Sequence, residues 1–386
     1  MTATSTSTAL QIQELADLCI EHLCDSPSDL KVCAMVSRSW ASAAQSHLFR
    51  KISVASNRCG SNHDWSHLLR TLRRSPHLTR HIRHLHINMQ AFSGSPICEL
   101  RFTGLYYVSI RDPCTGPGPF RVGIQQLLRL PTLGRVKIAG KFAGPSDFLE
   151  MWHGCSPSIA HVELLCIGFS LLHTLPISAD PSTRPILKSL GIRSALTNIR
   201  PWLRPDVCPL DISYLKVLSI ADGYEMLRWP EFASVLQTIE VLDLMIIIPP
   251  DAHVQHSSPT INLSALPHLG FIRMSVAGGL HRDGWQIILD ALSTITTPSS
   301  IRTIVIHSGS YLDVGGCNQL ESHVLSLPVH PLPIVEFEMA AIKSMTASNV
   351  HEYFPTMASK SLVRVIPRGG NRFEVQGGHW FWGDGR

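Results

Sequence analysis

Ile239-Glu240-Val241-Leu242-Asp243-Leu244 is the stretch of sequence that decides the fold. Its isoleucine and two leucines occupy the first, fourth and sixth places. The two leucines lie two residues apart, so both point to the same side of a β-strand, and Asp243 points to the other side. The hexamer therefore predicts a strand with one buried face and one polar face.

The same apolar spacing recurs ten times between Ile82 and Leu332. The first and last copies are 250 residues apart over nine intervals, and the mean period of about 27.8 falls within the 20 to 29 residues of leucine-rich repeats. The individual intervals are uneven, so we expect an irregular array. The copies begin at Ile82, Phe102, Leu133, Ile159, Leu187, Leu215, Ile239, Leu269, Ile301 and Leu332.

Amphipathic helical segments lie between these predicted strands. Two of them share one i, i+3, i+4, i+7 template: Trp65, Leu68, Leu69 and Leu72, and Trp285, Ile288, Leu289 and Leu292. A unit of one strand and one helix cannot bury its apolar face alone, so we predict an α/β solenoid of irregular leucine-rich-repeat-like units over residues 82–370. The alternative is a doubly wound α/β domain, which should carry a Gly-rich turn after its first strand, and the sequence has none.

Residues 10–50 show a helical rhythm instead. A first helix should end near Asp25, and Ser26-Pro27-Ser28-Asp29 has the residues that begin a second. We expect Leu30, Cys33, Val36 and Trp40 on one face of this second helix, with a short third helix from Ala41. Because three short helices bury little surface, the module should leave apolar side chains for a partner to cover.

Three segments of this module resemble an F-box. They are Glu14 to Leu23, the run Asp29-Leu30-Lys31-Val32-Cys33-Ala34-Met35-Val36-Ser37-Arg38-Ser39-Trp40, and His47-Leu48-Phe49-Arg50. The Val-Ser-Arg-x-Trp segment is the most specific part and is intact. One departure is that Gln11-Ile12 stands where the motif usually opens with Leu-Pro.

The resemblance implies that the chain is a substrate-recognition subunit of a cullin-type (SCF) E3 ubiquitin ligase. In that family the F-box docks on a Skp-type adaptor, and the repeats that follow hold the target protein. The alternative is a leucine-rich-repeat scaffold with a degenerate F-box that does not engage the ligase. Family pattern places the adaptor-facing side chains at Ile12, Leu15, Cys19, Leu23, Leu30, Val36 and Trp40.

The open side of the predicted strands is the expected surface for the target protein. Its early copies are basic and its last copy, with Glu336 and Glu338, is acidic, so we hypothesise that an acidic or phosphorylated segment docks near Arg135 and Lys137. The alternative is a solvated strand face without a ligand. The predicted target-binding residues are His84, His86, Tyr106, Arg135, Lys137, Arg193, Phe271 and Arg273.

The sequence does not favour catalysis, a cofactor or a metal site. It contains no G-x-S-x-G elbow, no phosphate-binding P-loop and no H-E-x-x-H motif. An α/β enzyme with a site of dispersed residues is a remaining alternative. His84 and His86 share a strand face but lack further ligands, and Arg70, Arg73 and Arg74 fit the solvated face of a helix, so neither zinc nor nucleic acid is expected.

Composition sets the remaining limits. The 386 residues are 44% hydrophobic and 16% charged with a net charge of +4, which excludes a wholly disordered chain and a highly basic nucleic-acid-coating protein. There is no secretory pattern and no apolar run of about 20 residues, so we expect a soluble cytoplasmic or nuclear protein without a membrane partner. The expected parts are a disordered start (1–9), the F-box-like module (10–50), a connecting helix and cap (51–81), the array (82–370) and a tail (371–386).

Overall fold

The computed structural model divides the chain into two compact units, unit 1 at Met1–Ile186 and unit 2 at Leu187–Arg386. The residues that it describes are 5–54, 63–88, 99–112, 118–142, 144–169, 184–193, 200, 203–204, 207–221, 224–247, 261–277, 282–296, 300–308, 314–339, 350–367, 373–375 and 378–380.

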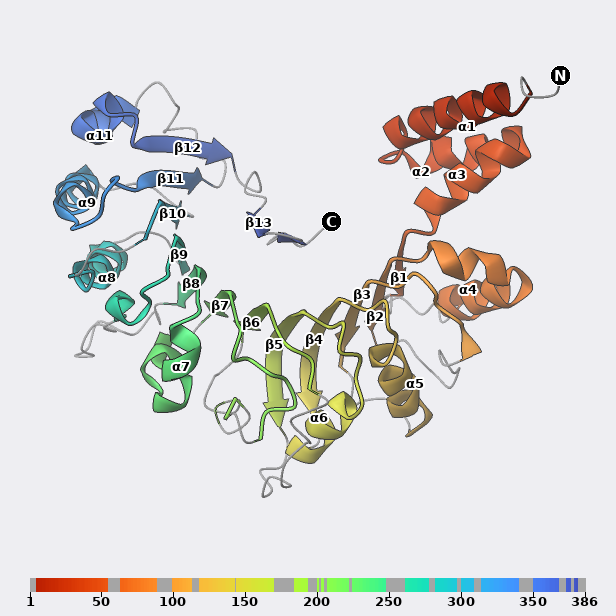
Figure 1. The fold of residues 1–386 in the computed structure, drawn as a ribbon, viewed down its shortest axis with the longest axis horizontal. Coiled ribbons are helices and arrows are strands. Elements are labelled where there is room, and N and C mark those ends of the chain that lie inside the picture. The colour runs from red at the N-terminus through yellow and green to blue at the C-terminus, as the bar shows by residue number, and fades with distance from the viewer. Residues whose placement is uncertain are drawn as a thin grey trace. The chain divides into compact units, whose positions relative to one another are not determined.

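Unit 1 begins with a three-helix module made of α1 (Ser5–His22), α2 (Pro27–Val36) and α3 (Arg38–Leu48). Its small core consists of Ile20, Leu30, Cys33 and Ala44. Both α1 and α2 pack against α3 (Figure 1). The expected three helices are therefore present, although α1 begins at Ser5, inside the segment that the sequence assigned to disorder.

The boundary between the second and third helices differs from the prediction. The second helix was expected to reach Trp40, but α2 ends at Val36 and the extended residue Ser37 caps α3. The Ser37 hydroxyl accepts a hydrogen bond from the backbone N–H of Trp40 at 3.3 Å. A serine that satisfies an unpaired N–H of a first turn is a helix start, and this signal outweighs the apolar spacing that crosses it.

The rest of unit 1 is a parallel β-sheet with its strands in sequence order. Helices lie along one face of these strands, and the other face carries none of the described helices (Figure 1). The strands are β1 (Lys51–Val54), β2 (His84–Asn88), β3 (Tyr107–Arg111), β4 (Arg135–Phe142) and β5 (His161–Phe169). The helices are α4 (His63–Arg74), the 3-10 helix η1 (Pro76–His81), α5 (Gly118–Leu128) and α6 (Pro145–Trp152).

Unit 2 repeats this plan, with each strand parallel to the next. Its strands are β6 (Ser189–Arg193), β7 (Val217–Ala221), β8 (Val241–Ile247), β9 (Phe271–Ala277), β10 (Thr303–Ser308), β11 (Ile334–Met339) and β12 (Val363–Pro367). Its helices are α7 (Ala233–Leu236), α8 (Arg282–Ser293), α9 (Val314–Ser326), α10 (Val350–Tyr353) and α11 (Pro355–Ser359), with 3-10 turns η7 (Tyr224–Arg228), η8 (Pro230–Phe232) and η9 (Leu263–Ala265). A short antiparallel hairpin, β13 (Phe373–Val375) with β14 (Gly378–Trp380), follows.

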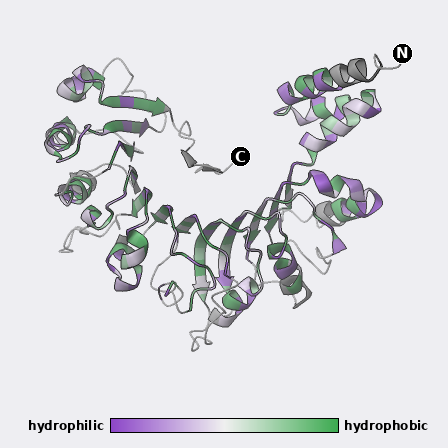
Figure 2. Cartoon of the chain, in the orientation of Figure 1, coloured by the Kyte–Doolittle hydropathy of each residue, from purple (hydrophilic) through white to green (hydrophobic). Residues whose placement is uncertain are grey.

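The repeated apolar spacing is what stacks the strands. Leu242, Ile272, Ile304 and Val335 occupy the same register position in β8 to β11, and each is 0% exposed. Full burial of such a side chain stabilises the fold by about 1.5 to 3 kcal/mol. Figure 2 shows hydrophobic residues concentrated along the strands and mixed with polar ones on the helices, as expected when helices expose one side.

The predicted α/β class is confirmed, the strands pair in parallel, and nine of the ten copies coincide with strands. The sequential strand order within each unit contradicts the doubly wound alternative, in which the order reverses. The predicted amphipathic helices coincide with α4 and α8.

Three strand assignments need correction. The copy placed at Phe102 begins three residues later, because Leu105, Val108 and Ile110 are the side chains buried at 0% in β3. The strand β1 was missed, although Phe49, Ile52 and Val54 show the same spacing. The strand β12 was missed because Lys360 replaces the first apolar residue of its copy.

Candidate binding surfaces

The three-helix module exposes apolar side chains on two of its helices. Leu15 and Leu18 of α1 are 61% and 54% exposed, and Val32, Met35 and Val36 of α2 are 59%, 78% and 62% exposed. On each helix these positions are three or four residues apart, so they form a stripe that points away from the module's core. We call the five residues together the module's outer stripes.

The predicted adaptor-facing set falls into two groups. Leu15, Cys19 and Val36 are exposed. Leu30 is in the core at 2% exposure, and Leu23 and Trp40 are half-buried and pack against that core, so these three stabilise the module. The side chain of Ile12 lies outside the described residues. Leu18, Val32 and Met35 were missed, although Val32 and Met35 follow the inward-facing Leu30 by two and five residues, which places them on the opposite side of a helix.

The open face of unit 1 is the side of β1 to β5 opposite its described helices. Its centre is the ring of Tyr107 in β3, whose centroid lies 5.7 Å from that of His84 and 5.2 Å from that of His86. The guanidinium carbon of Arg135 lies 5.4 Å from the same centroid. The strand register brings these groups together because His84, Tyr107 and Arg135 are paired positions of β2, β3 and β4.

Tyr107 occupies the position that the sequence assigned to Tyr106. Tyr106 lies just before β3, because the copy at Phe102 was placed three residues too early. Its ring covers Gly134, where an added Cβ would come within 2.4 Å of the ring carbon Cε2. Glycine at 134 therefore permits this close contact, and the ring of Tyr106 lies against the residue just before β4 instead of on the open face.

The open face of unit 1 also holds a buried acid, Glu163, which was not predicted from the sequence. Glu163 of β5 is 5% exposed, and its Oε1 lies 3.3 Å from the Nζ of Lys137 in β4. The two residues are paired positions of adjacent strands. The predicted basic character of the early strands is therefore partly neutralised at Lys137.

The histidines of this face lie in a basic environment. Burial, followed by the charges of Lys51, His84 and Lys137, lowers the pKa of His86 to about 4. Burial, followed by the charges of Arg50, Lys51 and Arg135, lowers the pKa of His84. Both effects have the same physical origin, since a positive imidazolium is unfavourable where water is excluded and neighbouring charges are positive.

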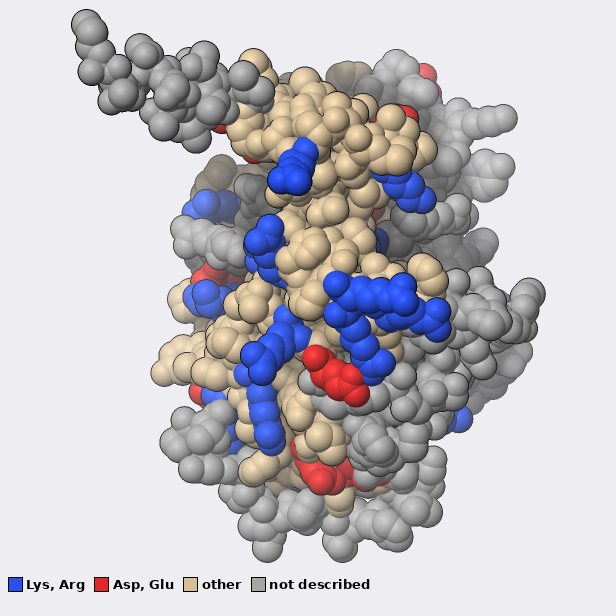
Figure 3. Space-filling model, turned by 90° about the vertical axis from the view of Figure 1, so that its right-hand side faces the viewer, with Lys and Arg blue, Asp and Glu red and all other residues tan. Residues whose placement is uncertain are grey.

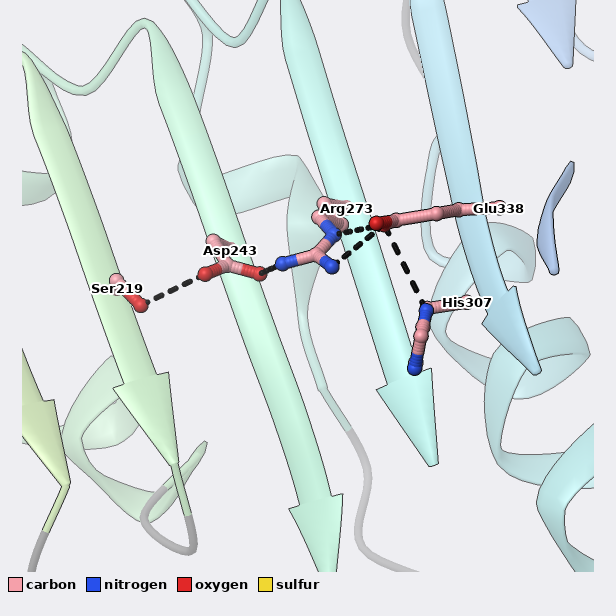
Figure 4. A network of polar contacts seen from close by, with 5 residues as sticks. All are labelled: Ser219, Asp243, Arg273, His307 and Glu338. Carbon is pink, nitrogen blue, oxygen red and sulfur yellow. Dashed lines mark hydrogen bonds and ion pairs between the residues drawn. The ribbon is translucent and has the colours of Figure 1, made fainter. Parts of the chain in front are cut away.

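The open face of unit 2 carries a buried polar network that joins five consecutive strands, β7 to β11 (Figure 4). The hydroxyl of Ser219 donates to Oδ2 of Asp243 at 2.9 Å, and Oδ1 of Asp243 lies 3.6 Å from Nη1 of Arg273. Arg273 donates from Nε and Nη2 to Oε2 of Glu338, at 3.0 and 2.5 Å. Nδ1 of His307 lies 3.6 Å from the same oxygen.

The network pairs Arg273 with acids of its own sheet, and its predicted role in holding a target stays a prediction. Its side chain is only 12% exposed, and its charge lies between the carboxylates of Asp243 and Glu338. Burial raises the pKa of Asp243, while Arg273, the Ser219 hydroxyl and Arg193 act in the opposite direction. Of the other predicted residues here, Phe271 begins β9 and Arg193 ends β6, and both are half-buried.

The outer face of α4 carries the arginines 70, 73 and 74, all of them exposed, as expected for the solvated side of an amphipathic helix. Arg73 pairs with Glu99. Figure 3 shows basic side chains in several separate groups, with fewer acidic ones, on the side of the molecule that carries α1 to α4. Within the described parts of the chain, no three His, Cys, Asp or Glu residues gather as metal ligands would.

Among the helices that the structure describes, none combines the length and the apolar character needed to cross a membrane. Comparison with models of known families gives no match for this chain, and comparison with curated proteins gives none either.

Proposed function

We propose that this chain is the substrate-recognition subunit of a cullin-type (SCF) E3 ubiquitin ligase. Its F-box-like module would bind a Skp-type adaptor, and its repeats would bind a target protein. The observation that carries the proposal is the pair of outer stripes, because a folded module rarely leaves five large apolar side chains in water without a partner. The resemblance of residues 14–50 to an F-box supplies the identity of that partner.

The energetics of the module favour this reading. Its core holds four buried residues, with Leu23, Trp40 and a few others packed around them, so it cannot bury the outer stripes by itself. Met35, at 78% exposure, is the most exposed of the five. Long flexible side chains of this kind contribute strongly to helix-mediated contacts, and a few such residues usually supply most of an interface's binding energy.

The second part of the proposal is that the strand–helix units form an irregular leucine-rich-repeat-like solenoid. Sequential parallel strands with a mean period of about 27.8 residues support it. In this reading the chain performs no chemistry. It raises the effective concentration of a target near a ubiquitin-charged enzyme held elsewhere on the cullin.

The test is retention of the full chain on purified Skp-type adaptor. Met35→Asp and Leu15→Asp each place a charge on an outer stripe without touching the core, so each should lower retention at least tenfold. Val122→Asp is the matched control: Val122 is 50% exposed on α5, outside the module, and this variant should bind as the unchanged chain does. Far-UV circular dichroism checks that all three variants keep their helices.

Two results would count against the proposal. If the unchanged chain is not retained, the leucine-rich-repeat scaffold with a degenerate F-box is the better description. If the chain is retained but Met35→Asp and Leu15→Asp bind as well as Val122→Asp does, adaptor binding does not use the outer stripes. Trp40→Ala is a poor test, because Trp40 packs against the module's core and its loss would remove packing that stabilises the module itself.

A further inference from the structure

A pocket of about 420 Å³ lies in unit 1 at the edge of the sheet where β1 and β2 begin. One wall comes from the end of α3 and the residue after its cap, with Ser46, His47 and Arg50. The other wall comes from η1 and the start of β2, with His81 and Arg83 and the open-face residue His84. Tyr106 completes the lining. The volume is within the range of small-ligand sites, about 300 to 1,000 Å³.

The side chains that line this pocket are basic or neutral. Two guanidinium groups, three imidazoles and two hydroxyls face the pocket, and none of its described lining residues is an acid. The guanidinium groups and imidazoles can donate hydrogen bonds, and the two arginines are permanently charged. The Ser46 hydroxyl already donates to the carbonyl of Ala43 at 2.7 Å, and Nε2 of His81 accepts from Nε of Arg80 at 3.2 Å, which leaves Nδ1 of His81 to donate. A lining of this kind suits an oxyanion and repels a cation, which sets it apart from a metal site even though it holds three histidines.

The arginines are held by the backbone around them. The carbonyl of Arg50 accepts the N–H groups of Arg83 and His84, at 3.0 and 2.9 Å, which ties the two walls together. Nη1 of Arg83 donates to the carbonyl of Gly104 at 3.0 Å, and a Cβ at Gly104 would come within 2.6 Å of that nitrogen. This hydrogen bond already restricts the side-chain conformations of Arg83. Binding of a ligand would therefore cost less conformational entropy at this residue.

The electrostatics around the pocket point the same way. Burial and then Arg50, Lys51 and Arg135 lower the pKa of His84, and burial and then Arg80, His77 and Arg83 lower that of His81. All of these charged neighbours are positive or can become so. An anion in the pocket would reduce their mutual repulsion and favour protonation of the histidines, which would then donate to it.

Two other places in the described chain, one groove and one side-chain network, do not offer unpaired positive side chains to a ligand. The groove of about 490 Å³ between α8 and α9, which includes Gln286, Asn318 and His323, is lined by amides and hydroxyls and has no arginine or lysine among its described residues. The buried network of unit 2 satisfies Arg273 with its own acids. Of these three places in the described chain, the pocket is the one where basic groups converge on an open volume.

We propose that this pocket binds a phosphate monoester, with Arg50 and Arg83 as its charged donors and His47, His81 and His84 completing the contacts. The ester can belong to a small phosphorylated molecule or to a phosphorylated side chain, since both present the same dianion. The inference does not depend on the adaptor, so it stands or falls separately from the proposed function.

The test is isothermal titration of the full chain with three probes: inorganic phosphate, glycerol 2-phosphate and a pentapeptide with a central phosphoserine, with the unphosphorylated pentapeptide as a blank. The unchanged chain should bind the phosphorylated probes and not the blank. Arg50→Gln should weaken that binding at least tenfold, because it removes a charge-assisted donor from an exposed side chain without disturbing the core. Arg70→Gln is the matched control, with the same loss of charge on the solvated face of α4, and should leave binding unchanged.

The proposal is overturned if no phosphorylated probe binds at 10 mM, if Arg50→Gln binds as tightly as the unchanged chain, or if Arg70→Gln weakens binding as much as Arg50→Gln does. The probes also separate the two sources of the ester. Tighter binding of the phosphopeptide than of glycerol 2-phosphate, by tenfold or more, assigns the site to a protein-borne phosphate, and equal binding assigns it to a small ester.

Discussion

Unit 1 and unit 2 place charged side chains at corresponding open-face positions of parallel strands, and the two faces use them differently. In unit 2, Arg273 is 12% exposed and lies between Asp243 and Glu338. In unit 1, Arg135 lies over the ring of Tyr107, beside two histidines whose pKa values are lowered by burial and then by positive neighbours. The comparison teaches that the same strand pattern can bury an arginine between two acids, as at Arg273, or set one over an aromatic ring beside histidines, as at Arg135, depending on which side chains the neighbouring strands place next to it.

The largest expected effect comes from removing the central charge of unit 2. Arg273→Leu removes the guanidinium that lies between the buried carboxylates of Asp243 and Glu338, so the free energy of unfolding should fall by about 3 to 5 kcal/mol at pH 7. Urea unfolding of the full chain measures the loss. Hydrogen exchange should rise in the peptides of β8, β9 and β11.

The matched control is Arg135→Leu in unit 1. It removes an arginine that contacts an aromatic ring, so its cost should be only about 1 kcal/mol. If Arg135→Leu and Arg273→Leu lower the free energy of unfolding by the same amount, the two arginines contribute equally to stability. The proposed difference between the two open faces would then be wrong.

The next effect is a pH dependence specific to unit 1. The pKa of His86 is about 4 in the folded chain, against 6.5 for an ordinary histidine, so the unfolded chain binds more protons between these values. His86 therefore contributes stability that is fully present above pH 6.5 and is lost as the pH falls towards 4. The groups responsible are the positive neighbours Lys51, His84 and Lys137, after burial itself.

The measurement is urea unfolding at pH values from 7.5 to 4.5. The unchanged chain should lose stability more steeply than His86→Gln, by at most about 1.4 kcal/mol per pH unit for the one proton involved. His268→Gln, a change at an exposed histidine before β9, should follow the unchanged chain. Equal slopes for the unchanged chain and His86→Gln would show that the basic surroundings of His86 do not act on its protonation.

The comparison also shows what the sequence could predict. Burial on one side of a strand needs only an apolar residue at every second position, so nine strands were found from spacing alone. The strand β12 escaped because Lys360 interrupts that spacing, and Trp40 was assigned to the wrong helix because Ser37 was not recognised as a cap. Both errors arise where one local signal outweighs the hydrophobic period.

The partners of the open-face charges could not be predicted in the same way. Arg273 and Glu338 are 65 residues apart in sequence, with β10 between their strands, and spacing alone describes each of them as a surface residue. Their pairing depends on the register of β9, β10 and β11, which only the structure supplies. A useful signal was nevertheless present, since opposite charges recur at open-face positions of nearby copies.

The smallest expected effect concerns the ion pair on the open face of unit 1. The side chain of Lys137 is 24% exposed and that of Glu163 is 7% exposed, so water screens the pair at one end only. A double-mutant cycle with Lys137→Met and Glu163→Gln should give a coupling energy of about 0.5 to 1 kcal/mol. The exposed pair of Lys216 and Glu240, with side chains 46% and 48% exposed, is the reference and should couple more weakly. A coupling of 3 kcal/mol or more for Lys137 and Glu163 would place this face in the same class as the Arg273 network, because both would then use buried charge to hold strands together.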